Sequence, residues 1–258
     1  MTDNGVIASE IYSLMRIEYF DKIEVIKVRL ALLRINYRYS FLFIINLKME
    51  TKSDEIVLGI DIGTTAICAG AWVTDHIEII SESAISRTIP AYVSFNDAKR
   101  IVGELAKSQA TINPKNTIYE FQSLIGRRIR SDINQEELEK FSFKVEPDPK
   151  GLPLFVVQYQ GETKKYTGEE LLGMILEHVK NMATSYFQKP VKKAVLTVPA
   201  YYNDAERQAT KEAATIAGLK VLRIINQPQA SCKAYALHKR DQNLRILLLS
   251  MLEGANAL

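Results

Sequence analysis

A glycine-containing turn between two apolar segments constrains the fold of this chain more than any other feature. The turn is the run Gly59–Thr65, with the sequence GIDIGTT, and residues 56–58 and 67–69 on either side of it are apolar. Short apolar runs bounded by turn residues are typical of strands. Glycine lets a backbone approach a ligand closely, and successive amides in a tight turn can surround an anion. The run therefore predicts a hairpin between two strands, either one that binds phosphate or an ordinary one.

Four residues of this turn are candidates for ligand binding. Gly63, Thr64 and Thr65 would surround phosphate oxygens, with the threonine hydroxyls as additional donors. Asp61 lies at the end of the first strand, where a carboxylate can face a magnesium ion or its bound waters.

Length and charge place the chain among ordinary globular proteins. Its 258 residues suffice for one large domain or two modest ones, with 47% apolar and 24% charged residues. The net charge of +3 is too small to indicate binding to nucleic acid or to an anionic membrane surface. Two cysteines give no disulfide framework, and three scattered histidines match no metal-ligand spacing. A reducing compartment, by default the cytoplasm, is expected.

The first part of the chain differs in character from the rest. Its longest uncharged run, Tyr39–Leu47, is far shorter than the roughly 20 residues that span a bilayer, and no secretory signal pattern is present. An amphipathic helix over Ile17–Ile35 is possible. We expect residues 1–54 to be an extension, either dispensable for stability or wrongly assigned to the protein, and we expect no membrane span.

The pattern after residue 55 is that of an α/β protein. Strands are expected at 56–60, 67–73 and 77–81 as a meander, followed by a mixed region with short strands at 91–95 and 155–159 and a helix near 103–110. Thr167 and Glu170 have the form of a capping box, and Asn203 is a second N-cap. The helix after Asn203 should turn Ile216 inward and end at Gly218. Further strands are expected at 193–198, 221–225 and 244–249, with a helix at 229–238. This order fits the ribonuclease-H-like fold.

A set of motifs, in a fixed order along the chain, is more specific than the pattern of elements. The motifs are Gly59–Thr65, Asn113–Thr117, Leu124–Arg127, Thr197–Asp204, Arg207–Lys211, Ala217–Leu219 and Val221–Asn226. Together they closely resemble the nucleotide-binding domain of the seventy-kilodalton heat-shock protein chaperones, over roughly residues 56 to 249. The block 199–211 separates this family from actins and sugar kinases, which share its general fold.

The resemblance implies an actin-like ATPase of two lobes, with the nucleotide between them, that acts in protein folding and the stress response. It implies ATP or ADP with Mg²⁺ as cofactor, Asp61 toward the water shell of the metal, and the hairpin residues toward the phosphates. Pro199 and Arg207 match the relay between the nucleotide and the interdomain linker. Arg223 matches a position that meets J-domain co-chaperones, which with unfolded client proteins are the implied partners. We expect residues 55–243 to be lobe I and 244–258 the truncated start of lobe II.

Three positions depart from the family pattern where chemistry takes place. Gln122 replaces a lysine that acts on the terminal phosphate, so a positive charge is lost there. Gln227 replaces a glutamate and keeps its shape without its charge. Met251 stands where the second phosphate loop has an aspartate, and in the same loop Glu253 would put negative charge beside the phosphates. No catalytic residue of the family is therefore intact, and hydrolysis of ATP is expected to be impaired.

Three functional interpretations follow from these observations. The chain is a chaperone-family ATPase with weak turnover, a non-enzymatic single lobe that binds co-chaperones, or a gene fragment without independent activity. The motifs favour the first as the family function. Gln122, Gln227, Met251 and the chain end at Leu258 favour the others.

Overall fold

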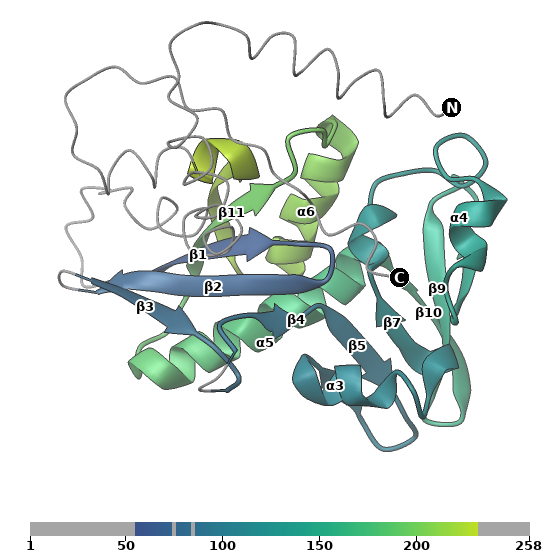
Figure 1. Cartoon of the computed structure of the whole chain (residues 1–258), viewed down its shortest axis with the longest axis horizontal. Coiled ribbons are helices and arrows are strands. Elements are labelled where there is room, and N and C mark those ends of the chain that lie inside the picture. The colour runs from purple at the N-terminus through teal and green to yellow at the C-terminus, as the bar shows by residue number, and fades with distance from the viewer. Residues whose placement is uncertain (1–54, 74–75, 84–85, 232–258) are drawn as a thin grey trace, which may run out of the picture. The chain divides into compact units, whose positions relative to one another are not determined.

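The computed structural model of the protein describes residues 55–73, 76–83 and 86–231. Its main element is a six-stranded sheet in which three parallel strands continue into an antiparallel meander, in the order β12-β11-β1-β2-β3 with β4 paired to β2 (Figure 1). The predicted meander and the predicted strand at 193–198 are confirmed. The strands are β1 (Val57–Ile62), β2 (Ala66–Val73), β3 (His76–Ile80), β4 (Ile89–Pro90), β11 (Lys193–Val198) and β12 (Lys220–Asn226).

Two helices pack together beside this sheet, α5 (Gly168–Phe187) and α6 (Asp204–Ile216). Each begins with a capping box, because the side chains of Thr167 and Asn203 accept from the N3 amides while Glu170 and Glu206 accept from the cap amides. Both N-caps were predicted from the sequence. Replacing such a cap with alanine typically costs about 1 kcal/mol.

Two three-stranded antiparallel sheets and several short helices fill the region between β4 and α5. One sheet has the order β6-β5-β7 and the other the order β10-β9-β8. The strands are β5 (Tyr92–Phe95), β6 (Arg100–Val102), β7 (Thr117–Tyr119), β8 (Lys144–Pro147), β9 (Pro153–Tyr159) and β10 (Glu162–Thr167). The helices are α3 (Glu104–Gln109), α4 (Gln135–Glu139) and the 3-10 turns η1 (Pro114–Asn116) and η2 (Phe121–Ser123).

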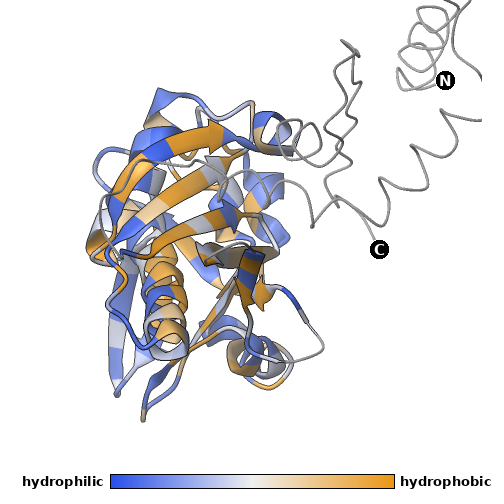
Figure 2. Ribbon diagram, turned by 90° about the vertical axis from the view of Figure 1, so that its left-hand side faces the viewer, coloured by the Kyte–Doolittle hydropathy of each residue, from blue (hydrophilic) through white to orange (hydrophobic). Residues whose placement is uncertain are grey.

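The strands of the central sheet are hydrophobic on both faces, and their predominantly orange colour is visible in Figure 2. Successive side chains of a strand point to opposite faces. Leu58 and Ile60 of β1 accordingly belong to the large core that also contains residues of α5 and α6. Val57 and Cys68 belong instead to a smaller cluster on the other face, together with Val195 and Ala230. A sheet with both faces apolar is typical of α/β folds.

One prediction about the core is wrong. Ile216 was expected to point inward from α6, but its side chain is 56% exposed. It lies at the last turn of the helix, beside Gly173 of α5, and only part of its surface is covered there. The helical period predicts the face of α6 on which Ile216 lies. At this end of the helix, however, α5 covers that face only in part.

The remaining predicted elements are only partly described. Residues 227–231 are helical, so the helix expected at 229–238 begins earlier than predicted. The expected strand at 244–249, the extension 1–54 and the segment 244–258 lie outside the described residues. Within the described part of the chain, no helix is both long enough and apolar enough to cross a membrane.

Candidate phosphate-binding site

The hairpin between β1 and β2 has the geometry that the sequence predicted. The amide of Gly63 donates to the carbonyl oxygen of Ala66 at 3.1 Å and closes the turn. A Cβ atom at position 63 would lie 2.6 Å from that same oxygen, so the turn accommodates only glycine without moving its backbone. The amide of Ala91 donates to the carbonyl of Thr65 at 3.0 Å and fixes the far side of the turn to the segment after β4.

The two threonines of the turn face outward from this closed backbone. Thr64 is half-buried and Thr65 is exposed. Among the described residues, neither side chain hydrogen-bonds to another side chain or to the backbone. The hydroxyl groups are therefore available to a ligand, as expected for donors that would contact phosphate oxygens.

Asp61 lies near the end of β1 that leads into the turn, and β1 itself lies between the neighbouring strands β11 and β2. Its register partners are Thr197 on β11 and Cys68 on β2. One carboxylate oxygen, Oδ1, accepts hydrogen bonds from the hydroxyl of Thr197 and from Nε2 of Gln227, the latter at 3.0 Å. Burial raises the pKa of the Asp61 carboxyl, and the two hydrogen bonds lower it part of the way back.

Gln227 begins the helical segment after β12 and is 8% exposed. Its Nε2 donates to Oδ1 of Asp61 and also to the carbonyl oxygen of Ile62, at 3.2 Å. Both partners are acceptors, so only the NH₂ end of the amide can face them. Gln227 thus attaches the end of β12 directly to the hairpin Gly59–Thr65.

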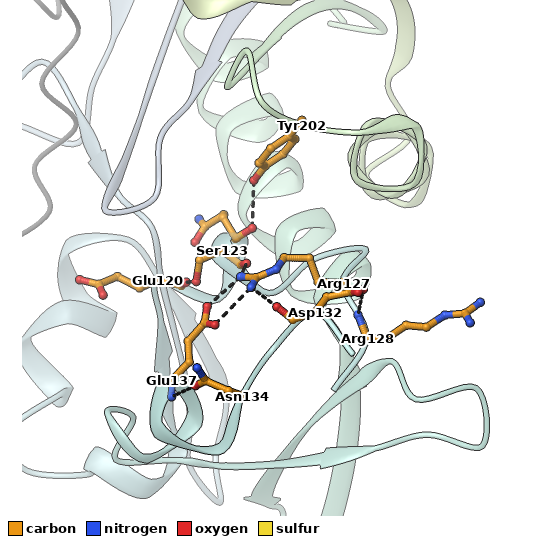
Figure 3. Close-up of polar contacts among 9 residues, drawn as sticks. Glu120, Ser123, Arg127, Arg128, Asp132, Asn134, Glu137 and Tyr202 are labelled. Carbon is orange, nitrogen blue, oxygen red and sulfur yellow. Dashed lines mark hydrogen bonds and ion pairs between the residues drawn. The ribbon is translucent and has the colours of Figure 1, made fainter. Parts of the chain in front are cut away.

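Gln122, on η2, lies in a different environment. It is 2% exposed, and neither its amide nitrogen nor its amide oxygen has a hydrogen-bond partner among the described residues. Leaving a buried polar group without a partner costs about 1–3 kcal/mol. The backbone of η2 is nevertheless held firmly, since the hydroxyl of Tyr202 donates to the carbonyl of Gln122 at 2.9 Å (Figure 3).

Arg127 fastens the segment that carries η2. One guanidinium nitrogen, Nη1, donates to the carbonyl of Ser123 at 2.8 Å and to Oε1 of Glu137 at 2.7 Å. The other, Nη2, donates to Oε2 of Glu137 at 3.2 Å and to the carbonyl of Asp132. Figure 3 shows this fork between Arg127 and Glu137. The hydrogen bond to Glu137 is the main cause that raises the pKa of Arg127.

The predicted relay residues connect the ends of β11 and β12 to the start of α6. Pro199 is buried directly after β11. Arg207 of α6 donates from Nε to the carbonyl of Tyr202 at 2.9 Å and from Nη2 to Oδ1 of Asn226 at 2.8 Å. Since Tyr202 contacts Gln122 and Asn226 precedes Gln227, this arginine lies between the two glutamines that depart from the family pattern.

Arg223 is separate from this group. It is exposed on β12, and no contact joins it to the hairpin, to Gln122 or to Arg207 among the described residues. Met251, the third departure, lies outside the described residues.

Two residues of the site were not predicted. Thr197 and Tyr202 contact Asp61 and Gln122, and both belong to a motif that was used for the resemblance without a role of their own. The contact of Thr197 with Asp61 could have been predicted, because both residues lie near the ends of expected strands. Parallel strands that end side by side bring their last residues together. Cys68, beside Asp61, is not a reactive group: burial is the main cause that raises its pKa to about 12, so its thiol stays protonated at neutral pH.

Comparison with known proteins identifies the relatives of this chain. The family model described as Hsp70 protein matches residues 57–256. Heat shock cognate 70 kDa protein 3 of Dictyostelium discoideum is 47% identical over 200 residues, which are 75% of this chain and 31% of the relative. Heat shock 70 kDa protein 2 of Paracoccidioides lutzii is 45% identical over 197 residues, which are 76% of this chain and 30% of the relative. Putative heat shock 70 kDa protein 7 of Homo sapiens is 42% identical over 200 residues, covering 78% of this chain and 54% of the relative. The chain thus matches between about a third and a half of the length of these curated relatives.

Proposed function

The chain belongs to the Hsp70 family, and on that premise we propose that it binds the phosphate groups of ATP or ADP at the hairpin Gly59–Thr65 and hydrolyses ATP poorly or not at all. In this proposal the described residues form lobe I of an actin-like nucleotide-binding domain. The family's ATP-dependent protein folding is then the process in which the lobe takes part.

The threonine hydroxyls beside the closed turn at Gly63 are the observation that carries the proposal. The turn leaves no room for a Cβ atom beside the carbonyl oxygen of Ala66, so its backbone is bare on this side, and such a turn suits an anion that approaches the backbone directly. An ordinary tight hairpin also needs the glycine, but it does not need two hydroxyl donors at the turn. The geometry supports phosphate binding, and the ligand class comes from the family.

Weak hydrolysis is expected from the two glutamines that replace charged residues of the family. Gln122 brings a neutral amide where the family has a lysine, so it adds no positive charge as negative charge develops on the phosphoryl oxygens. Loss of one preorganised stabilising group commonly costs about 10²–10³ in rate. Gln227 uses its amide nitrogen on Asp61 and Ile62, and its amide oxygen is a neutral acceptor, so it lacks the carboxylate charge with which the family's glutamate would take a proton from an attacking water.

Phosphate binding is tested by removing the two hydroxyls together, in a Thr64→Val/Thr65→Val variant. We expect the variant to keep its thermal unfolding temperature and to bind a fluorescent ADP analogue at least tenfold more weakly, because donors to phosphate are lost. Thr111→Val is the matched control, since Thr111 is an exposed threonine outside the site. Equal affinity of all three proteins would contradict the proposal.

A second candidate function is a non-enzymatic lobe that binds J-domain co-chaperones. Its supporting observation is that Arg223 is exposed on β12, away from the hairpin, where a partner can reach it. Capture by an immobilised J-domain protein that is lost in Arg223→Ala and kept in Lys220→Ala would favour this function. An absence of both nucleotide binding and capture would favour the third interpretation, a product without independent activity. The cytoplasm and unfolded client proteins remain proposals drawn from the family.

A further inference from the structure

The two carboxylate oxygens of Asp61, the acidic residue of the hairpin Gly59–Thr65, lie in different surroundings. Oδ1 accepts hydrogen bonds from the hydroxyl of Thr197 and from Nε2 of Gln227. Oδ2 has no hydrogen-bond partner in the part of the chain that the structure describes, and it is not buried. One oxygen is therefore held by the protein, while the other remains open to a ligand.

Magnesium, which the family implies beside the phosphates, fits this arrangement through a bound water. In nucleotide sites the ion usually keeps several waters and is held through one or two carboxylates and phosphate oxygens. Oδ2 of Asp61 can accept a hydrogen bond from a metal-bound water without any change to the two hydrogen bonds of Oδ1. When bound, the ion would supply positive charge beside the phosphates.

The plane of the Asp61 carboxylate is fixed by donors from two different elements. The terminal torsion of an aspartate is broad, so a carboxylate without partners does not keep one plane. Thr197 is the register partner of Asp61 on the parallel strand β11, and Gln227 begins the helical segment after β12. Hydrogen atoms prefer to lie near the plane of the oxygen that accepts them. Two donors to Oδ1 therefore fix that plane, and with it the position of Oδ2.

Thr197 is the more rigid of the two donors. Its side chain is 0% exposed and branched at Cβ, which restricts its first torsion. Its single hydroxyl hydrogen is donated to Asp61. Gln227 has a longer side chain and divides its NH₂ group between Asp61 and the carbonyl of Ile62. Without the hydroxyl of Thr197, Asp61 would keep one donor, which does not fix the plane by itself.

We propose that Thr197 is a positioning residue of the phosphate-binding site: together with Gln227 it holds Oδ1 of Asp61, so that Oδ2 is presented to a metal-bound water. Thr197 acts through Asp61 and not on the ligand. Loss of a residue that orients a metal ligand typically costs about 10–100-fold in metal affinity or activity. The inference rests on the proposed function, because magnesium is expected here only together with nucleotide phosphates.

The test measures the Mg²⁺ enhancement, defined as the affinity for the fluorescent ADP analogue in Mg²⁺ divided by the affinity in EDTA. We expect a clear enhancement in the wild-type chain and its loss in Asp61→Asn. Thr197→Val replaces the hydroxyl with a methyl group of similar size and should reduce the enhancement about tenfold. Thr197→Ser keeps the hydroxyl and should retain the enhancement. A general loss of structure would weaken binding in both conditions and cancel in the ratio.

Thr117→Val is the matched control. Thr117 is also a strand threonine with 0% exposure, and its hydroxyl donates to the carbonyl of Asn113 at 2.8 Å. Among the described residues it has no hydrogen bond to Asp61. The same chemical change at this position removes a buried hydrogen bond and should leave the Mg²⁺ enhancement at the wild-type value.

A double variant separates positioning from an independent effect on the site. In Asp61→Asn/Thr197→Val the carboxylate is absent, so the enhancement should be no lower than in Asp61→Asn alone. If Thr197→Val lowers the affinity equally in Mg²⁺ and in EDTA, or if Thr197→Ser loses as much of the enhancement as Thr197→Val, the proposal is wrong. Should Thr197→Val not fold, Gln227→Met removes the other donor to Oδ1. An unchanged enhancement in Gln227→Met would then overturn the proposal.

Failure of the proposed function would look different. A wild-type chain that binds the analogue in neither condition would overturn phosphate binding, and this inference with it. A wild-type chain that binds the analogue with the same affinity in Mg²⁺ and in EDTA would keep the proposed function and overturn the role of Thr197 alone.

Discussion

Arg127 holds the segment that carries Gln122, because it donates to the carbonyl of the adjacent residue, Ser123. All the hydrogens on its two Nη atoms are used, for Glu137 and for the carbonyls of Ser123 and Asp132. A lysine has a single point of charge and cannot reproduce this fork. The sequence predicted that Gln122 departs from the family, but not that its amide would be buried without a partner, because burial depends on segments that are distant in the sequence.

Substitution of Arg127 tests how much its paired hydrogen bonds to Glu137 contribute to the stability of the fold. We expect Arg127→Lys to lower the free energy of unfolding by about 1–3 kcal/mol, since charge-assisted hydrogen bonds to a half-buried carboxylate are lost. Denaturation by urea, followed by circular dichroism, measures the change. Arg128→Lys is the control, because Arg128 is exposed and its guanidinium forms no hydrogen bond or ion pair with a residue in the described part of the chain. A similar loss in both variants would show that the fork has no special role.

At the scale of elements, the sequence predicted the long regular segments well and the small sheets poorly. α5, α6 and β11 combine a clear apolar period with capping residues, and all three occur where they were expected. β10 was missed, because its sequence ETKKYT is mostly polar. It is a strand because β9 pairs with it in register from Glu162 to Thr167. Pairing of this kind comes from tertiary context rather than from the pattern of the strand itself.

The contact between α5 and α6 depends on a glycine. Alanine in place of glycine inside a helix usually stabilises by about 1 kcal/mol. At Gly173 a Cβ atom would lie 2.8 Å from Cγ2 of Ile216 and 3.2 Å from the carbonyl oxygen of Ala213. We therefore expect Gly173→Ala to lower the unfolding temperature.

A double variant identifies the cause. Adding Ile216→Ala to Gly173→Ala should restore part of the lost stability, because it removes the closest obstructing atom, Cγ2, while Cβ of residue 216 at 3.1 Å remains. Thermal unfolding of the two single variants and of the double variant gives the coupling. Additive effects would mean that Ile216 is not responsible.

At the scale of the whole described region, the site depends on the order of the parallel strands. Thr197 and Gln227 are 136 and 166 residues away from Asp61 in the sequence, and the arrangement β12-β11-β1 brings them together. The individual strands were predictable from their composition. Their order was not, and it came only from the resemblance to a known family. The hydrogen bonds of Gln227 could not be predicted at all, since the family has a different residue there.

We expect the hairpin to bind nucleotide phosphates without efficient turnover, because Gln122 and Gln227 lack the charges of the residues that they replace. The most direct measurement follows phosphate release from ATP by the wild-type chain and by Thr64→Val/Thr65→Val, in the same samples in which nucleotide binding is recorded. We predict that the wild-type chain binds nucleotide, that the variant binds it at least tenfold more weakly, and that phosphate release by the wild-type chain is at least about a hundredfold slower than that of a full-length Hsp70 chaperone. Phosphate release by the wild-type chain at the rate of a full-length chaperone would contradict this prediction.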